Sequence, residues 1–369
     1  MNLNSHLIYF DITNVCDAGC DFCMYREGRK NPERLQLDTV SSLNVYRLIN
    51  HPGTDCIVIS GEGEPFSNEN ALKQILDSSI GGKKFQIITN GLWKKISVPE
   101  RFHELNKIAK KNGDQYTVRL SIDSYHASRI GFKRYEEFFD FVASSSDDVP
   151  NVSLAVRSLI EDKTFTRRLI SKILKRSKMN YELREICVLE DELHLNNTPI
   201  KIQYKNLVNP YKLGRVDCFK LGGYTLAIGN KYGKLFTLGN LNTTSDSKGL
   251  NLTVKPNGNV FFYGAEIHPY GNIFTELLDI ERFEHIVSKD PFINALYTVP
   301  FNDLIEKLRE IPGVSSRIDK INNPYWIIKD LYKTHKEEMS EIFRMFLKEN
   351  QETYSLKNKN LYIQVTHNI

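Results

Sequence analysis

The sequence predicts an α/β protein built on a partial (β/α)6 TIM-like barrel, with a small β-hairpin plus helical C-terminal extension. Strand-like and helix-like segments alternate over the first half of the chain, as in repeated β-α units. From about residue 196 the sequence changes to short β-like pieces, and its last part shows helical periodicity. We expect the barrel in residues 1–195, the extension in residues 196–300 and a helical segment in residues 301–369.

The expected barrel strands are short and apolar, and helix-like segments separate them. The strands are expected at 7–10, 56–59, 85–88, 116–122, 152–159 and 185–189, and the helices at 38–50, 71–80, 101–111, 135–143 and 164–178. Parallel strands joined in this way form a barrel that is open on one side. Functional sites of such folds gather at the carboxyl ends of the strands.

Composition restricts the class of protein. The 369 residues carry a net charge of only +4, with 41% hydrophobic and 25% charged residues, which is typical of a globular protein and not of a nucleic-acid binder. No apolar run is long enough to span a membrane, and the first residues do not resemble a signal peptide. Six cysteines, three of them clustered, favour a reducing cytoplasmic location over a disulfide scaffold.

The three clustered cysteines, Cys16, Cys20 and Cys23, follow the first expected strand with C-x3-C-x2-C spacing. This spacing allows one loop to place three thiolates around one inorganic centre, which leaves one corner of a cubane cluster without a protein ligand. A structural zinc site is an alternative, with His6 or His126 as a fourth ligand, although no second pair of ligands follows at short spacing. A disulfide would leave one of the three thiols unpaired.

Polar and glycine-rich segments follow the next strands. The second strand runs into Ser60–Pro65 (SGEGEP), the third ends in Thr89-Asn90-Gly91, and the fourth ends in Ser121-Ile122-Asp123. Ser121 and Asp123 are two residues apart and therefore share a face of a strand. Each segment also has a simpler interpretation, because Gly, Pro and Asn favour turns and Asp commonly caps helices.

Together, in this order, the cysteine loop with Phe22, G-x-G-E-P, T-N-G and S-x-D resemble the radical S-adenosylmethionine (radical SAM) superfamily over about residues 6–190. The resemblance implies one [4Fe–4S] cluster on the three cysteines, S-adenosylmethionine (SAM) as cofactor, and reductive cleavage of SAM to a 5′-deoxyadenosyl radical. It implies that the G-x-G-E-P loop contacts the SAM amino group, and that Ser121 and Asp123 contact its carboxylate and ribose. The implied SAM-binding residues are Gly61, Gly63, Glu64, Asn90, Ser121, Asp123 and Arg157.

The second half of the chain resembles the SPASM or twitch extension of that superfamily. Tyr211–Val216 contains a Gly-Arg pair, Leu250–Val260 reads as a hairpin with a Pro-Asn-Gly turn, and Tyr270–Ile273 follows it. No cysteine occurs after Cys218, so a four-thiolate auxiliary cluster is not expected. We expect this extension to close the open side of the barrel. Residues 303–309 and 325–348 are expected to be helical, and residues 361–365 to form an edge strand.

The expected function is that of a radical SAM enzyme acting on a peptide or natural product, with flavodoxin or ferredoxin as reductant. Sugars, nucleosides and other small metabolites are alternative substrates, and a non-catalytic iron–sulfur or zinc protein is an alternative of another class. We expect neither nucleic-acid nor membrane partners. Cys218 is a candidate hydrogen-atom donor, which would make the reaction redox-neutral, for example an epimerisation; a buried packing role is the alternative.

Overall fold

The computed structural model describes residues 5–20, 23, 34–38, 43–93, 96–196, 198–207, 220–233, 235–240 and 249–366. The side chains of residues 232, 325 and 350–366 are not described. In these ranges no helix combines the length and the apolar character that a membrane span requires.

One curved sheet of eleven strands organises the chain, in the order β11-β10-β9-β1-β2-β3-β4-β5-β8-β7-β6. The six barrel strands are β1 (His6–Asp11), β2 (Thr54–Ser60), β3 (Lys84–Thr89), β4 (Gln115–Ser121), β5 (Val152–Leu159) and β8 (Thr198–Lys205). All neighbouring pairs among them are parallel. Because β11 and β6 lie at opposite ends of the strand order, the sheet does not close. The predicted fold class is confirmed.

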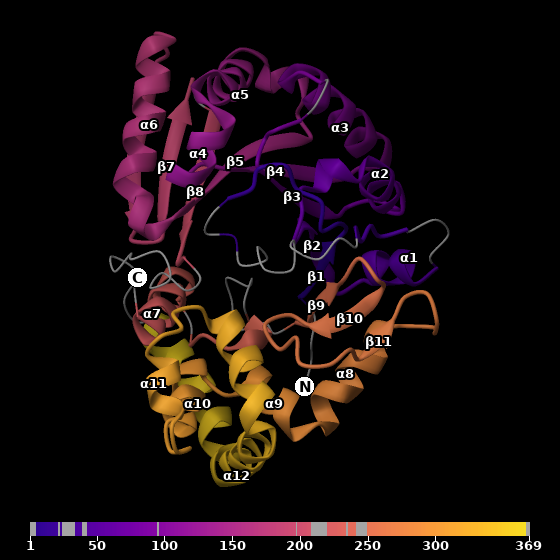
Figure 1. The fold of residues 1–369 in the computed structure, drawn as a ribbon, viewed down its shortest axis with the longest axis vertical. Helices are drawn as coiled ribbons and strands as arrows, with labels where there is room; N and C mark the ends of the chain where they lie inside the picture. The colour runs from indigo at the N-terminus through magenta and orange to yellow at the C-terminus, as the bar shows by residue number, and fades with distance from the viewer. Residues whose placement is uncertain are drawn as a thin grey trace.

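Helices connect the barrel strands, and Figure 1 shows α2, α3, α5 and α6 on the outer side of the curved sheet. The helices of this half are α1 (Leu43–Asn50), α2 (Glu69–Asp77), α3 (Val98–Asn112), α4 (Ser124–Ile130), α5 (Phe132–Ser145) and α6 (Lys163–Arg176). Local sequence fixes several helix ends. In α3, Ser97 and Glu100 form a reciprocal capping box, and Gly113 ends the helix with φ 73°.

The sixth barrel strand differs from the prediction. We expected it at residues 185–189, but the chain first forms an antiparallel hairpin of β6 (Tyr181–Cys187) and β7 (Glu190–Leu195). The strand that pairs with β5 is β8. Residues 186–189 read like a barrel strand because they are an apolar run, but they cover the end of β6 and the turn after it. Mostly exposed β6 forms the outer edge of the sheet.

The predicted hairpin of the extension is present as β9 (Asn251–Val254) and β10 (Asn259–Phe262), followed by β11 (Gly271–Asn272). Strand β9 pairs in parallel with β1, so the extension continues the barrel sheet at the edge opposite β8. Tyr9 and Thr253 face each other in this register.

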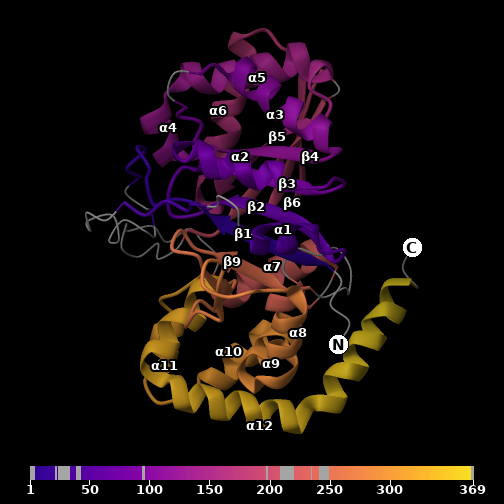
Figure 2. The same cartoon turned by 90° about the vertical axis from the view of Figure 1, so that its right-hand side faces the viewer.

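The remaining elements are α7 (Leu221–Tyr232), α8 (Ile280–Lys289), α9 (Pro291–Thr298), α10 (Phe301–Leu308), α11 (Val314–Ile318) and α12 (Pro324–Thr366). Residues 361–365 lie in α12, so the expected edge strand is wrong. In Figure 2, α12 runs below α9 and α10 and then extends away toward the C-terminus; His335 interrupts its helical geometry. Phe292 stacks on Phe343 and joins α9 to α12.

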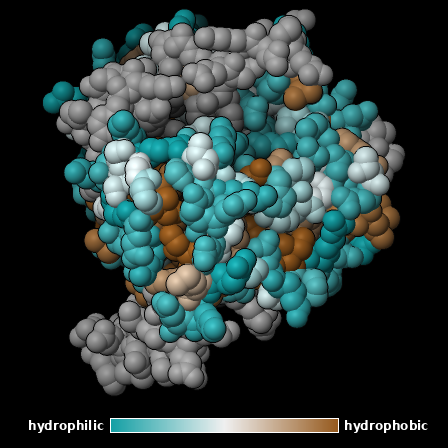
Figure 3. Space-filling view, turned by 60° about the horizontal axis from the view of Figure 1, so that its bottom comes forward, coloured by the Kyte–Doolittle hydropathy of each residue, from teal (hydrophilic) through white to brown (hydrophobic). Residues whose placement is uncertain are grey.

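Apolar side chains of this helical end point inward, including Ile293, Phe301 and Leu304, which are fully buried. Figure 3 brings the lower end of the molecule forward, and among its described residues hydrophilic side chains predominate, with apolar ones in small groups between them. The helices therefore pack mainly on one another and on the extension.

Candidate functional site

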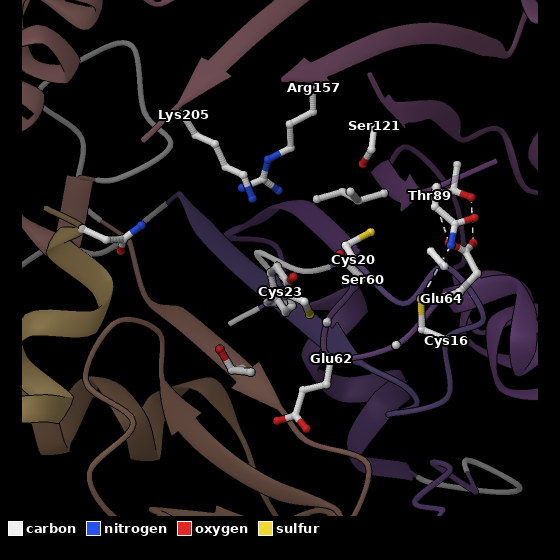
Figure 4. A pocket seen from close by; sticks show the side chains of 18 of the residues that line it. Cys16, Cys20, Cys23, Ser60, Glu62, Glu64, Thr89, Ser121, Arg157 and Lys205 are labelled. Atoms are coloured by element: carbon white, nitrogen blue, oxygen red, sulfur yellow. Dashed lines mark hydrogen bonds between the residues drawn. The ribbon is translucent and has the colours of Figure 1, made fainter. Parts of the chain in front are cut away.

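A pocket of about 220 Å³ lies at the carboxyl ends of the barrel strands, where the extension faces them (Figure 4). Four barrel strands end in a polar residue that lines it: Ser60, Thr89, Ser121 and Lys205. The cysteine loop, the G-x-G-E-P loop and residues of the extension complete the wall. These further residues include Cys16, Cys20, Cys23, Gly61, Glu62, Gly63, Glu64, Asn90, Asp123, His126, Arg157, Tyr224, Thr253, Lys255, Tyr263, Glu266, Asn323, Trp326 and Lys329.

The base of the cysteine loop is held by the chain that returns from it. Backbone and side-chain hydrogen bonds join Asn14 to Leu35 in both directions, and the Leu37 amide donates to the Ile12 carbonyl at 2.9 Å. The buried Asn68 amide donates to the carbonyls of both Ile12 and Leu37 at 3.0 Å. The loop therefore starts and ends on fixed backbone. Phe22 lies outside the described residues.

The glycines of the G-x-G-E-P segment allow that loop to pack closely on its neighbours. Gly61 has φ +122°, and a Cβ atom there would lie 1.8 Å from the Asp11 carboxylate. A Cβ atom on Gly63 would lie 2.4 Å from the Val15 carbonyl oxygen, just before Cys16. The Glu64 amide donates to that same carbonyl at 2.8 Å. The loop is thereby held against the start of the cysteine segment.

Glu64 joins the loop after β2 to the end of β3. Its buried carboxylate accepts hydrogen bonds from the Thr89 hydroxyl at 2.6 Å and the Asn90 backbone N–H at 2.8 Å. Burial raises the pKa of Glu64 to about 7, against the opposing effect of these hydrogen bonds. Through these contacts Glu64 holds the loop after β2 against the end of β3.

Two of the three cysteine sulfurs have polar neighbours. The Asn90 side-chain amide donates to the Cys16 sulfur at 3.6 Å, and the His126 ring hydrogen-bonds to Cys20. The Nδ1 atom of His126 lies 2.7 Å from a carboxylate oxygen of Asp123. Burial lowers the pKa of His126, but Asp123 and Cys20 outweigh it and raise the pKa to about 10.

Asp123 acts as the N-cap of α4, which is the simpler of its two interpretations. One carboxylate oxygen accepts from the amides of Tyr125 and His126, and the other pairs with the His126 ring. Ser121 also lines the pocket, and no hydrogen bond of its hydroxyl is seen within the part of the chain that the structure describes. Both residues lie at the pocket, as expected. The Asp123 carboxylate is engaged in hydrogen bonds with α4, whereas no described residue hydrogen-bonds to the Ser121 hydroxyl.

Two cationic side chains lie side by side on the pocket wall that β5 and β8 form. Figure 4 shows the side chains of Arg157 and Lys205 reaching toward each other from neighbouring strands. Burial, followed by repulsion from Arg157, lowers the pKa of Lys205 to about 7. Arg119 lies deeper in the barrel and donates to the side-chain oxygens of Gln86 and Gln203.

A buried ion-pair network joins the extension to the barrel. Lys255, in the turn after β9, lies 3.2 Å from Asp11, 3.4 Å from Glu62 and 3.3 Å from Glu266. Burial raises the pKa of Asp11 to about 7, although Lys255 opposes that shift. Next to this network the rings of Tyr9 and Tyr263 stack with centroids 5.3 Å apart, one from the barrel and one from the extension.

The three cysteines offer the donor set of an iron–sulfur cluster. Cys16, Cys20 and Cys23 line the same pocket, and no disulfide is present among the described cysteines. The ligands of a [4Fe–4S] cluster bind separate corners of it, so three thiolates of one loop can each take one iron. The donor chemistry therefore fits an iron–sulfur cluster.

The structure brings together all the candidate cluster and SAM residues whose positions it describes, since each lines this one pocket. Cys218 and the Gly214-Arg215 pair lie outside the described residues. The sequence interpretation did not identify Lys205 or Lys255. Lys205 was missed because the sixth strand was misplaced, and Lys255 because nothing in its hairpin turn indicates its partners. His126 entered only as an alternative metal ligand; its spacing of three residues from Asp123 is the signal for their pairing.

The chain matches no family model and no curated protein. Among solved structures, it is similar to "Native anSMEcpe with bound AdoMet and Cp18Cys peptide", with a TM-score of 0.49 and 14% identity over 93% of this chain and 99% of that one. It is also similar to "Crystal structure of HydG: A maturase of the [FeFe]-hydrogenase", with a TM-score of 0.36 and 10% identity over 99% of this chain and 83% of that one.

Proposed function

We propose that this protein is a radical SAM enzyme in which Cys16, Cys20 and Cys23 hold one [4Fe–4S] cluster and SAM binds in the same pocket. The observation that supports this best is that three cysteines of one short loop line a pocket together with the polar ends of parallel barrel strands. The cluster, when bound, supplies the electron for reductive cleavage of SAM, whose 5′-deoxyadenosyl radical takes a hydrogen atom from the substrate.

The protein's own residues hold and orient these groups. Asn90 and His126 contact the sulfurs of Cys16 and Cys20, which restricts where those sulfurs point. Glu64 keeps the loop after β2 against the end of β3 and thereby preserves the pocket wall. These contacts preorganise the site before any cofactor binds.

Ser121 and Arg157 are the proposed binding residues for the SAM carboxylate. They face each other in the register of β4 and β5, and both line the pocket. An arginine can bind a carboxylate through two parallel hydrogen bonds. Asp123 is engaged with its helix and His126, so we assign the carboxylate to Ser121 and Arg157.

The proposed substrate is a peptide or another natural product, and the proposed reductant is a small electron-transfer protein such as flavodoxin or ferredoxin. The extension supports a role in shaping the substrate pocket, because Thr253, Lys255, Tyr263 and Glu266 lie in its wall. Because the extension has no cysteine after Cys218, we propose one cluster per chain.

Anaerobic reconstitution tests the proposal directly. Wild-type protein should bind about four iron atoms per chain and, with SAM and dithionite, form 5′-deoxyadenosine. Replacing Cys16, Cys20 and Cys23 with Ala should abolish both results while the circular dichroism spectrum is retained. Iron binding without 5′-deoxyadenosine would favour the non-catalytic alternative. Retained SAM cleavage in the triple variant would refute the proposal, and about eight or more iron atoms per chain would refute the single cluster.

A further inference from the structure

Among the described residues, the β5 and β8 wall of the pocket contains more positive charge than its neighbours balance. Arg157 and Lys205 both line the pocket from adjacent strands, and both are half-buried. Within the described ranges, neither side chain forms a hydrogen bond or ion pair with another residue. Two like charges placed together in a pocket repel each other unless an anion joins them.

The charged groups that the structure describes around Lys205 do not supply that anion. Arg157 and Arg119 repel its ammonium group, whereas Asp123 and Cys23 attract it. Asp123 is already paired with His126 at 2.7 Å. The lowered pKa of Lys205 indicates that the attraction does not compensate for burial and repulsion.

Lys205 lies on the side of the pocket that borders the start of α12. Its register partner in β5 is Leu159, whereas Arg157 lies level with Ser121 of β4. The next residue, Asn206, donates to the Asn322 carbonyl at 2.9 Å, immediately before the start of α12. Asn323 and Trp326 from this region also line the pocket. Lys205 thus lies between the proposed SAM-binding strands and the C-terminal helical segment.

We propose that Lys205 binds a carboxylate group of the substrate, beside the SAM carboxylate bound by Arg157; this inference rests on the proposed function. The charges set the ligand class. SAM contributes one carboxylate, which balances Arg157, and the single remaining ammonium of Lys205 balances one further negative charge. A monoanionic carboxylate meets that requirement, whereas a phosphate dianion exceeds it. Lys205 is therefore a substrate-binding residue that selects acids at the barrel mouth.

Acetate is a suitable probe because it consists of one carboxylate group and a methyl group. Reconstituted holoenzyme is saturated with SAM at pH 6.5 and titrated with sodium acetate, against sodium chloride of equal ionic strength, while the apparent Tm is followed. Wild type and Lys205→Arg should show a saturable rise in Tm. In Lys205→Met the apparent affinity for acetate should be at least tenfold weaker. Lys201→Met, an exposed site on the same strand, should respond as wild type does.

Binding of SAM provides a second readout. Measured by equilibrium dialysis, its Kd should change less than twofold in Lys205→Met and rise at least tenfold in Arg157→Met. If Lys205→Met instead weakens SAM binding, and that loss disappears with decarboxylated SAM, the lysine binds the SAM carboxylate and the proposal is wrong. Lys205→Gln serves as the neutral variant if Lys205→Met does not fold.

Other results would also overturn the inference. An unchanged acetate response in Lys205→Met excludes the site, and a stronger Lys205-dependent response to phosphate than to acetate excludes the carboxylate class. A shifted cluster midpoint potential with unchanged acetate binding would show that Lys205 balances the cluster charge.

If wild type binds neither iron nor SAM, the proposed function fails. The acetate response of the metal-free protein, compared with that of Lys205→Met, then still tests the anion site.

Discussion

The Glu64 carboxylate accepts a hydrogen bond from the Asn90 backbone N–H at 2.8 Å, and so connects two loops that both border the cysteine segment. The same carboxylate also accepts from the Thr89 hydroxyl. Because Glu64 is buried among donors, its state of protonation affects both the pocket and the stability of the barrel mouth.

Glu64→Gln should destabilise the protein at acidic pH by about 1–3 kcal/mol, because one acceptor oxygen of the carboxyl group is replaced by an amide that faces donors. Burial raises the pKa of Glu64 from 4.5 to about 7, so the folded protein holds this proton more tightly than the unfolded chain does. The resulting contribution to the free energy of unfolding is fully present below pH 4.5 and is lost as the pH rises through about 7. The difference in unfolding free energy between wild type and Glu64→Gln should therefore shrink from pH 5 to pH 8. Urea unfolding of the metal-free proteins measures this.

The matched control is Glu337→Gln, at an exposed glutamate of α12, which should show no such pH dependence. A difference for Glu64→Gln that grows with pH would mean that Glu64 is ionised in the folded protein throughout this range.

Asn90→Ala should lower the midpoint potential of the reconstituted cluster, because it removes the amide N–H that points at the Cys16 sulfur at 3.6 Å. Hydrogen bonds to cysteine sulfurs stabilise the more negative, reduced cluster. One such bond, worth about 1 kcal/mol, corresponds to a shift of roughly 20–60 mV for one electron. A redox titration followed by electron paramagnetic resonance measures the shift.

Asn90→Asp keeps the turn, since its carboxylate still accepts from the Leu92 amide, and its added negative charge should lower the potential further than Asn90→Ala does. Both variants should retain the wild-type iron content. An unchanged potential in both would show that the amide does not contact the cysteine once the cluster is bound.

Lys255→Met should reduce stability by about 3–5 kcal/mol, because it leaves the fully buried Asp11 without its cation. The pKa of Asp11, already raised to about 7 by burial, should rise further, and the loss should be larger above pH 7 than below it. Chemical unfolding at pH 5.5 and pH 8 measures both effects.

Asp11→Asn in the same chain should restore part of that stability at pH 8, since it removes the unpaired charge. Lys329→Met is the matched control: its amine is more exposed and contacts Glu266 at 3.2 Å, so it should cost less than about 1 kcal/mol. Equal losses in the two lysine variants would contradict the central role of Lys255.

Cys218→Ala tests the proposed redox-neutral reaction. If Cys218 returns a hydrogen atom to the substrate radical, the variant should still form 5′-deoxyadenosine but yield stalled or cross-linked substrate, as detected by mass spectrometry. Cys187→Ala is the control, because Cys187 lies at the end of β6 and is not among the residues that line the pocket. Full product yield from Cys218→Ala would remove the donor role.

Local sequence predicted much of the barrel. The apolar runs at β1 to β5 are nearly continuous because both faces of parallel strands are covered, and their positions were predicted within a few residues. The sixth strand was misplaced because residues 186–189 form a short apolar run like those of the barrel strands, although they cover the end of β6 and the turn into β7. Which strand pairs with β5 depends on contacts between distant residues, such as Val156 with Ile202.

The sequence by itself determined the chemistry that this site can hold: three cysteines at C-x3-C-x2-C spacing, and polar residues placed where successive strands end. Only the tertiary structure decided which of these residues are committed to the fold, as Glu64 and Asp123 are through their hydrogen bonds. It also placed Lys255 beside Asp11, 244 positions away, and placed Lys205 beside Arg157 with no ion-paired anion in the part of the chain that it describes. The physical reason is that spacing specifies ligands within one loop, whereas charge balance in a buried pocket depends on elements that meet only when the sheet is complete.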